Sequence, residues 1–286
     1  MTMLRHALLV LSLAAAAPGA ERIRVLLVDG QNNHKWMETT PVIRRILEET
    51  GLFSVEVATT PPKGGDMASF RPDFAAFKVV VSNYNGEPWS QETKRRFEAF
   101  VRSGGGFVPV HAANNSFPEW PEYNRMIALG GWGDRNEKDG PYAKFRDGRL
   151  VLDTRPGRGG HHGRRHAFQV INRNTRHPIT KGLPSRWMHA EDELYDSLRG
   201  PASDITLLST AYSDPATGGT GDHEPMLFTV SYGKGRVFHT TLGHDVEAMR
   251  CAGFAATLQR GVEWAATGKV TLKPPADFPR DTVRKR

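Results

Sequence analysis

A histidine ends a short apolar run in the stretch Gly104-Gly-Gly-Phe-Val-Pro-Val-His111-Ala-Ala. Residues 107–110 are typical of a buried parallel strand, and ligands of open α/β sheets bind outside the carboxyl ends of such strands. The two small residues after His111 permit a tight turn, as on a nucleophile elbow, so we expect its imidazole at the rim of a pocket. Because the elbow residue is neither Ser nor Cys, the expected chemistry is proton transfer, metal binding or sugar recognition. A strand-end histidine bonded only to backbone is the alternative.

Three histidines that follow apolar strands could share one metal ion. His34 comes after the first predicted strand, His111 after the fourth and His244 after the last. Loops that follow parallel strands meet at one edge of the sheet, and imidazole is a common ligand of transition metals. The candidate cofactor is therefore a divalent Zn, Mn, Fe or Ni ion in an open site. The alternative is three unrelated polar loop residues, because the chain has no short ligand spacing such as His-x-x-x-His with an adjacent Glu.

Four carboxylates fall within the six residues Glu191-Asp-Glu-Leu-Tyr-Asp196. Their mutual repulsion favours a cationic partner. Glu193 is a candidate general acid or base, which would need a pKa raised towards neutrality to donate a proton at pH 7. Tyr195 shares its face in an extended chain, so the candidate catalytic residues are His111, Glu193 and Tyr195. An exposed acidic turn paired with nearby Arg186 and Arg199 is the alternative.

Polar and aromatic residues of the predicted loops could contact a sugar, since amides and imidazoles hydrogen-bond hydroxyls and aromatic faces stack on sugar rings. The candidate substrate contacts are Asn32, Trp36, Asn83, Asn114, Trp132 and His162. For each tryptophan, core packing is the alternative. The histidine-rich stretch 161–166 is equally typical of a solvated loop.

Apolar runs alternate with amphipathic segments, and this pattern predicts the strands and helices that position the candidate site residues. Strands are expected over residues 23–28, 54–58, 77–82, 107–110, 205–211, 226–231 and 236–240, and helices over 41–50, 91–102 and 246–266. Such alternation predicts an α/β fold with a doubly wound, mostly parallel sheet and helices on both faces. Thr40 is the expected N-cap of the first helix. Pro109 argues against a central position for the strand that ends at His111.

Residues 1–20 are typical of a signal peptide, with Arg5, an apolar stretch over 7–17, and small residues that allow cleavage after Ala17 or Ala20. We therefore expect export to the periplasm or beyond, with an amphipathic anchor as the alternative. Residues 21–268 are expected to form one domain and 269–286 a tail. No later apolar run has the length of a membrane span.

The single cysteine, Cys251, cannot form an internal disulfide, so core packing must hold the fold. The formal net charge of +7 is scattered over loops and the tail. Without a basic stripe interleaved with aromatic residues, nucleic acid is not an expected partner.

Taken in order, these motifs resemble the trehalose-utilisation (ThuA-like) family. The resemblance rests on the segments Val25–Gly30 with His34, Gly104–Ala113, His177–Leu183, Asp192–Tyr195, Tyr232–His239 and Leu242–Asp245, and it spans about 22–268. It implies a fold similar to class I glutamine amidotransferases and to flavodoxin. The elbow of those enzymes carries a Cys that works with a His, whereas this elbow carries His111, so amidotransfer is not expected.

The resemblance also implies a role in disaccharide catabolism through 3-keto-sugars, beside a sugar dehydrogenase. The first hypothesis is an exported lyase or hydrolase of keto-glycosides. The keto group acidifies a neighbouring C–H, His111 or Glu193 acts as base or acid, and the aglycone leaves by elimination. A metal held by the histidines would polarise the keto oxygen. The second hypothesis is a non-catalytic sugar-binding protein, or a partner subunit, that uses the same pocket.

Overall fold

The computed structural model describes residues 21–286, so the predicted leader lies outside the described residues. One half of the central sheet consists of parallel strands in the order β2-β1-β3-β4-β13. Their bounds are β1 Ile23–Asp29, β2 Phe53–Thr59, β3 Val79–Ser82, β4 Gly106–Pro109 and β13 Gly235–Thr240. The carboxyl ends of these strands therefore share one edge of the sheet, as the sequence predicts.

The sheet continues beyond β13 as an antiparallel extension, which makes it mixed. These strands are β12 His223–Tyr232, β11 Ile205–Tyr212, β8 His166–Asn172 and β9 Arg186–Asp192. A hairpin of β5 (Tyr142–Arg146) and β6 (Arg149–Asp153) joins β12, and β7 (His161–His162) pairs with β10 (Tyr195–Asp196) in a small ribbon. The histidine-rich stretch is thus paired with the acidic one.

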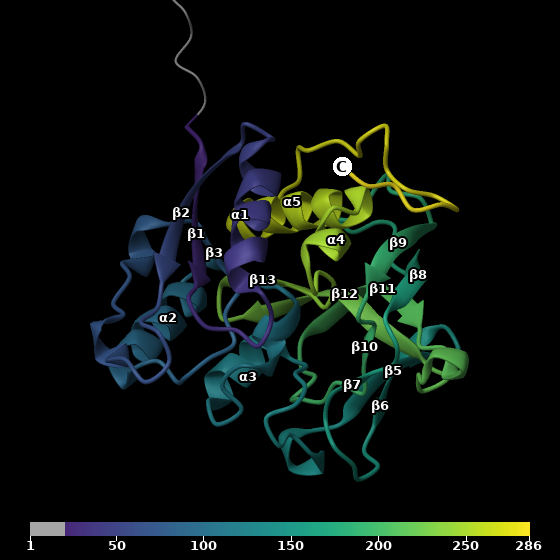
Figure 1. The fold of residues 1–286 in the computed structure, drawn as a ribbon, viewed down its shortest axis with the longest axis horizontal. Coiled ribbons are helices and arrows are strands. Elements are labelled where there is room, and N and C mark those ends of the chain that lie inside the picture. Colours follow the sequence, from purple (N-terminus) through teal and green to yellow (C-terminus); the bar gives the residue numbers. More distant parts are fainter. Residues whose placement is uncertain (1–20) are drawn as a thin grey trace, which may run out of the picture.

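Helices cover both faces of the parallel half (Figure 1). One face carries α1 (Trp36–Glu48), α4 (Val246–Met249) and α5 (Ala252–Thr267), and the other carries α2 (Gln91–Arg102) and α3 (Pro121–Ile127). Alternate residues of β1 enter the two cores, Val25 and Leu27 on the side of α1 and Leu26 and Val28 on the side of α2. The predicted α/β class, with helices on both faces, is confirmed. Short 3-10 turns are η1 Met67–Ser69, η2 Phe74–Ala76, η3 His111–Asn115, η4 Glu137–Asp139 and η5 Pro215–Thr217.

Local boundaries differ from the sequence prediction at three places. The first helix already begins at Trp36, with Lys35 at the N-cap position, and the Thr40 hydroxyl accepts a hydrogen bond from Asn83 and does not cap the helix. The predicted helix over 246–266 is two helices, with Cys251 as the N-cap residue of α5. Pro109 lies in a central strand, because the pairing of β4 with β13 lapses there and resumes at Val110.

The C-terminal tail runs along the ends of α4 and α5 (yellow in Figure 1). The ring of Phe278 packs 5.5 Å from that of Trp187, and the Ala252 amide donates to the Arg284 carbonyl at 2.8 Å. Within residues 21–286, none of the helices combines the length and apolar character that a membrane span requires.

Candidate functional site

His111 stands directly after β4, at the start of η3, with a positive φ of 47°. Few non-glycine residues adopt this conformation, and a sharp elbow after a strand is where it is found. The ring Nδ1 lies 2.7 Å from the carbonyl oxygen of Thr241, and the ring packs against that of Tyr195 at a tilt of 31°, with centroids 4.1 Å apart. The expected strand-end position is confirmed. The expected place at a pocket rim is corrected, because His111 is only 3% exposed beneath Tyr195.

Three histidine rings meet at the carboxyl edge of the parallel strands. His34 lies in the loop after β1, and His244 in the loop after β13. The ring centroid of His34 is 5.0 Å from that of His111 and 4.5 Å from that of His244, and the latter two are 5.5 Å apart. Segments more than two hundred residues apart in the chain therefore present three imidazoles to one point.

Glu193 supplies a carboxylate at the same point from the turn between β9 and β10. Its Oε2 lies 3.0 Å from His244 Nδ1, 3.4 Å from His111 Nε2 and 3.7 Å from His34 Nε2. Burial alone would raise the pKa of Glu193, but the three imidazoles that face its carboxylate, His111 foremost, outweigh burial and hold this pKa well below its usual range. A lowered pKa favours the ionised carboxylate at pH 7, and with it a role as base or metal ligand, whereas the alternative role as proton donor would need a raised pKa.

The four side chains suit a divalent metal. Each offers one ligand atom, and these atoms all lie within 4.8 Å of one another. His111 Nε2 and His244 Nδ1 are buried without a hydrogen-bond partner. Buried polar atoms are rarely left unpaired, and three imidazoles with one carboxylate form a donor set that zinc, iron, manganese and nickel accept. The four residues could thus hold such an ion.

Asp192 fixes the backbone that carries two of these residues. Its Oδ1 accepts the amides of Glu193 at 2.8 Å and His244 at 3.1 Å, and its Oδ2 accepts that of Gly243 at 2.7 Å. His189 Nε2 lies 2.8 Å from Oδ2, and both side chains are fully buried. Asp192 therefore ties the β9–β10 turn to the loop after β13.

A cavity of about 300 Å³ opens beside the cluster. Besides His34 and Glu193 it is lined by amide and aromatic or imidazole side chains, namely Asn33, Asn85, Asn115, Trp132, His162 and Tyr195. The rings of Trp132 and Tyr195 are 4.6 Å apart, and His162 Nε2 lies 3.6 Å from Glu193 Oε1. Burial, followed by the negative charge of Glu193, raises the pKa of Tyr195 well above its usual value, so its hydroxyl keeps its proton at neutral pH.

Four other predicted sugar contacts, Asn32, Trp36, Asn83 and Asn114, do not line this cavity. The Asn83 amide donates to the Thr39 and Thr40 hydroxyls at 3.0 Å each, and Asn32 accepts the backbone amide of His34. Asn114 is fully buried beside His239 Nε2, and Trp36 opens α1. The prediction that these four residues contact a sugar in the cavity is therefore corrected. Asn32, Asn83 and Asn114 instead hydrogen-bond within the loops around the cavity.

The cavity instead takes three asparagines that the sequence analysis passed over. Asn33, Asn85 and Asn115 follow β1, β3 and β4. Each lies one or two residues from a predicted sugar contact. The expectation that loops after parallel strands meet at one edge therefore identified the correct loops but not the residue in each that lines the cavity.

Of the stretch 191–196 only Glu191 is exposed, with Arg165 3.9 Å away, so this stretch is not an exposed acidic turn. Asp196 is fully buried and accepts hydrogen bonds from Ser213 and Ser197, with His161 Nδ1 at 3.0 Å. Arg199 is buried and donates to the carbonyls of Gly140, Arg155 and Gly157. The expected alternative partner Arg199 is therefore engaged elsewhere.

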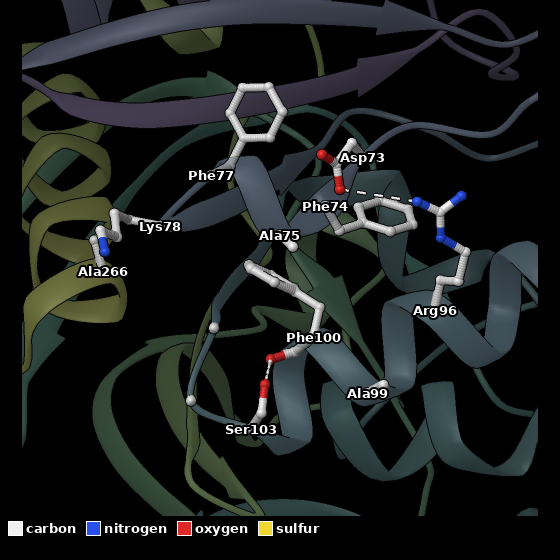
Figure 2. A pocket seen from close by; sticks show the side chains of 12 residues that line it. Asp73, Phe74, Ala75, Phe77, Lys78, Arg96, Ala99, Phe100, Ser103 and Ala266 are labelled. Atoms are coloured by element: carbon white, nitrogen blue, oxygen red, sulfur yellow. Dashed lines mark hydrogen bonds and ion pairs between the residues drawn. The ribbon is translucent and has the colours of Figure 1, made fainter.

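A larger groove of about 660 Å³ lies at the other end of the strands (Figure 2). It is bordered by residues that precede β3 and β4, such as Lys78 and Gly105, and Arg96 lies 3.8 Å from Asp73 across it. Phe74 and Phe100 make it largely apolar. Because ligands of open α/β sheets bind at the carboxyl edge, the smaller cavity at the histidine cluster is the candidate site.

Comparison with known proteins places these features in context. A sequence model of the ThuA family, described as trehalose utilisation, matches residues 24–265. The chain is 51% identical to a protein described as ThuA-like from Parabacteroides merdae ATCC 43184, with a TM-score of 0.91 over 93% of this chain and 98% of that one. Another protein described as ThuA-like, from Bacteroides uniformis ATCC 8492, is 18% identical with a TM-score of 0.60 over 92% and 99%, and it shows the shared fold alone. No curated protein matches the chain.

Proposed function

This chain belongs to the ThuA family, described as trehalose utilisation, and from that premise we propose that it is a metal-dependent enzyme that processes a sugar at the histidine cluster. The observation that carries the proposal is the convergence of His34, His111, His244 and ionised Glu193 beside a cavity of about 300 Å³. Drug-sized ligands occupy pockets of roughly this size, and a buried donor set of this kind is typical of a functional site.

The finer proposal is that the substrate is a keto-glycoside. A bound divalent ion would supply Lewis-acid stabilisation of negative charge on a keto oxygen. The C–H beside the keto group is acidic, and Oε1 of Glu193 would accept its proton, since Oε2 is the oxygen that faces the three imidazoles. The electron pair left on that carbon forms a C=C bond as the bond to the aglycone oxygen breaks. The departing oxygen takes a proton from water, and the Tyr195 hydroxyl can donate a hydrogen bond to it. Trp132 and His162 border the space that the sugar would fill.

We further propose that residues 1–20 direct export to the periplasm or beyond, as their composition indicates. A sugar dehydrogenase that oxidises a hydroxyl would supply the keto group that the elimination needs. Fractionation of cells that express the full chain would show whether a shortened protein leaves the cytoplasm. Retention of the full-length protein inside the cell would contradict export.

The test of the main proposal measures metal content and turnover on the same sample. Protein purified without a histidine tag should contain about one divalent ion per chain by elemental analysis. Incubation with a 3-keto-disaccharide should release monosaccharide, and EDTA should abolish release until the metal is restored. His166→Ala provides the matched control, because this histidine lies outside the cluster.

A non-catalytic sugar-binding protein, or a partner subunit of an oxidoreductase, is the second candidate. The cavity lining supports this candidate as well as it supports the enzyme, since amide groups and an aromatic side chain can bind a sugar without catalysing a reaction. Sugar affinity without product release, from protein that carries its metal, would decide for this candidate and against the enzyme.

A further inference from the structure

The chain contains a single Asn-Gly pair, Asn85-Gly86, and this pair lies in the loop that follows β3. The Asn85 side chain is half-buried and lines the cavity beside the histidine cluster. An asparagine followed by glycine is especially prone to deamidation, because a residue without a side chain leaves its amide nitrogen open to the preceding carboxamide. The pair therefore places a reactive carboxamide at the edge of the candidate site.

The local hydrogen bonding leaves both reacting groups available. Within the described range 21–286, the Gly86 amide donates no hydrogen bond, so its nitrogen is free to attack. The Asn85 carboxamide donates to Asn33 Oδ1 at 2.6 Å, and Asn33 is itself exposed. A single contact at the surface of the loop is therefore what restrains the Asn85 side chain.

The packing of this loop requires the glycine. A Cβ atom at residue 86 would lie 2.4 Å from Gln31 Cβ and 2.7 Å from the Tyr84 hydroxyl, which is closer than real Cβ atoms approach their neighbours. A larger residue at this position would shield Asn85 from attack, but it does not fit. The fold therefore retains the reactive pair.

We infer that Asn85 is a site of spontaneous deamidation, which converts a neutral amide of the cavity lining into a carboxylate. The Gly86 nitrogen attacks Cγ of Asn85 to close a five-membered succinimide ring. The Cγ–Nδ2 bond breaks, and ammonia leaves with the proton of the Gly86 amide. One water molecule then opens the ring, at Cγ to give aspartate or at the main-chain carbonyl to give isoaspartate. The reaction needs neither metal nor sugar, so the inference does not depend on the proposed function.

Contacts on both sides of the pair favour aspartate as the product. The Asn85 amide donates to the Gln31 carbonyl at 2.9 Å, and the Glu87 amide donates to Gln31 Oε1 at 2.9 Å. Isoaspartate inserts an extra carbon into the backbone between these two anchors, whereas aspartate leaves the backbone length unchanged. The folded loop should therefore yield mainly aspartate.

The test follows the full chain in warm, mildly alkaline buffer and compares it with a synthetic peptide of residues 82–90. Peptide mass analysis of the protein should show a gain of about 1 Da in the fragment that carries Asn85, because an oxygen replaces an NH group. The free peptide should react at least about 10-fold faster, since the folded loop must first release the side chain, and should yield mainly isoaspartate. A protein that gains no mass at Asn85 while the peptide reacts would overturn the inference.

Two variants assign the reaction to the geometry of the loop. Asn33→Ala removes the hydrogen bond that restrains the carboxamide and should speed deamidation of the folded protein about 3-fold. Asn85→Gln is the matched control and should gain no mass on the same timescale, because its side chain would have to close a less favourable six-membered ring. An unchanged rate in Asn33→Ala would contradict the role of that contact, and mainly isoaspartate from the folded protein would contradict the role of the Gln31 anchors.

Deamidation would change the charge of the cavity, in which Glu193 is the one carboxylate among the described lining residues. Asn85→Asp reproduces the aspartate product. At low ionic strength it should bind Mn²⁺ about 2- to 10-fold more tightly than the wild type, because a second negative charge attracts the cation. Asn174→Asp adds the same charge away from the cavity and should leave the affinity unchanged.

This consequence rests on the proposed metal site, whereas the modification does not. Equal Mn²⁺ affinity in Asn85→Asp and the wild type would contradict the consequence. Absence of Mn²⁺ binding by either protein would refute the metal site, and a mass gain at Asn85 in the same sample would still support the modification.

Discussion

His111 Nδ1 lies 2.7 Å from the carbonyl oxygen of Thr241, while its Nε2 faces the carboxylate of Glu193 at 3.4 Å. A carbonyl oxygen only accepts, so Nδ1 carries a hydrogen, which leaves Nε2 as the ring nitrogen that can bind a metal. Metal-binding histidines are commonly oriented in this way by a backbone carbonyl. The contact with Thr241 therefore prepares His111 as a ligand.

Two substitutions of His111 separate ligation from stability. Asparagine can place its amide nitrogen where Nδ1 stands and tolerates the positive φ, but it has no atom at the position of Nε2. We expect both His111→Asn and His111→Ala to retain less than about a tenth of the metal of the wild type. The free energy of unfolding should fall by about 1–3 kcal/mol in the alanine variant, which leaves the buried Thr241 carbonyl without its donor, and by less in the asparagine variant.

Elemental analysis gives the metal content of these variants, and urea denaturation gives the free energy of unfolding. Full metal content in His111→Asn would remove this histidine from the ligand set. Equal destabilisation by both substitutions would show that the Thr241 contact contributes little.

Asp192→Asn should impair the site although Asp192 is not itself one of the four clustered ligands. Both carboxylate oxygens accept backbone amides, so either orientation of an asparagine would turn its own N–H groups against a donor. We expect metal affinity to fall about 10- to 100-fold, as for other residues that support metal ligands. The free energy of unfolding should fall by roughly 3 kcal/mol, because His189 loses its buried partner.

Titration with a competing chelator measures the metal affinity of Asp192→Asn. Asp73→Asn, an exposed aspartate at the opposite edge of the sheet, is the control and should change neither quantity. Wild-type affinity in Asp192→Asn would mean that the two loops hold their positions without this carboxylate.

Much of this site could be predicted from strand ends alone. His34, His111 and His244 each follow an apolar run, and parallel topology brings such positions to one edge. The approach of Glu193 could not be derived in the same way, because it depends on the register of the antiparallel strands β8 and β9, which no local pattern specifies. Asn114 and Asn115 show the finer limit, since they are adjacent in the turn after His111, yet only Asn115 lines the cavity while Asn114 contacts His239.

His239 should make the protein less stable in mild acid. This residue of β13 is fully buried, with Nδ1 bonded to the Ile127 carbonyl and Nε2 3.1 Å from the Asn114 amide. Burial lowers its pKa from 6.5 to about 4. A folded-state pKa below the unfolded value means that the unfolded chain binds the proton more readily. Its stabilising contribution is therefore complete above pH 6.5 and is lost as the pH falls towards 4.

Between pH 7 and pH 5, this single group should lower the free energy of unfolding by about 2 kcal/mol. Other groups also titrate, so the measured quantity is the difference between wild type and His239→Gln in urea denaturation at the two pH values. The advantage of the wild type over His239→Gln in the free energy of unfolding should be about 2 kcal/mol smaller at pH 5 than at pH 7. Parallel pH dependence in the two proteins would show that His239 does not titrate as its burial implies.

Arg135 should be irreplaceable by lysine, because its guanidinium joins the two loops that form the cavity wall. Nη1 donates to the carbonyls of Asn115 at 3.0 Å and Gly131 at 2.9 Å, and Nη2 donates to the Ser116 carbonyl and Asn124 Oδ1 at 2.8 Å each. Burial lowers its pKa to about 10, so it stays charged at neutral pH. A lysine keeps the charge, but a single ammonium cannot reproduce a planar fork with four acceptors.

We expect Arg135→Lys to lower the free energy of unfolding by about 2–4 kcal/mol, since at least two buried carbonyls lose a charged donor. The loop that carries Trp132 should also open more often, which limited trypsin digestion would reveal as faster cleavage after the exposed Lys138. Arg125→Lys, at an exposed arginine that contacts only Glu122 among the described side chains, is the matched control and should leave both measurements unchanged. Wild-type cleavage at Lys138 together with lost stability would place the role of Arg135 in the core and not in the cavity wall.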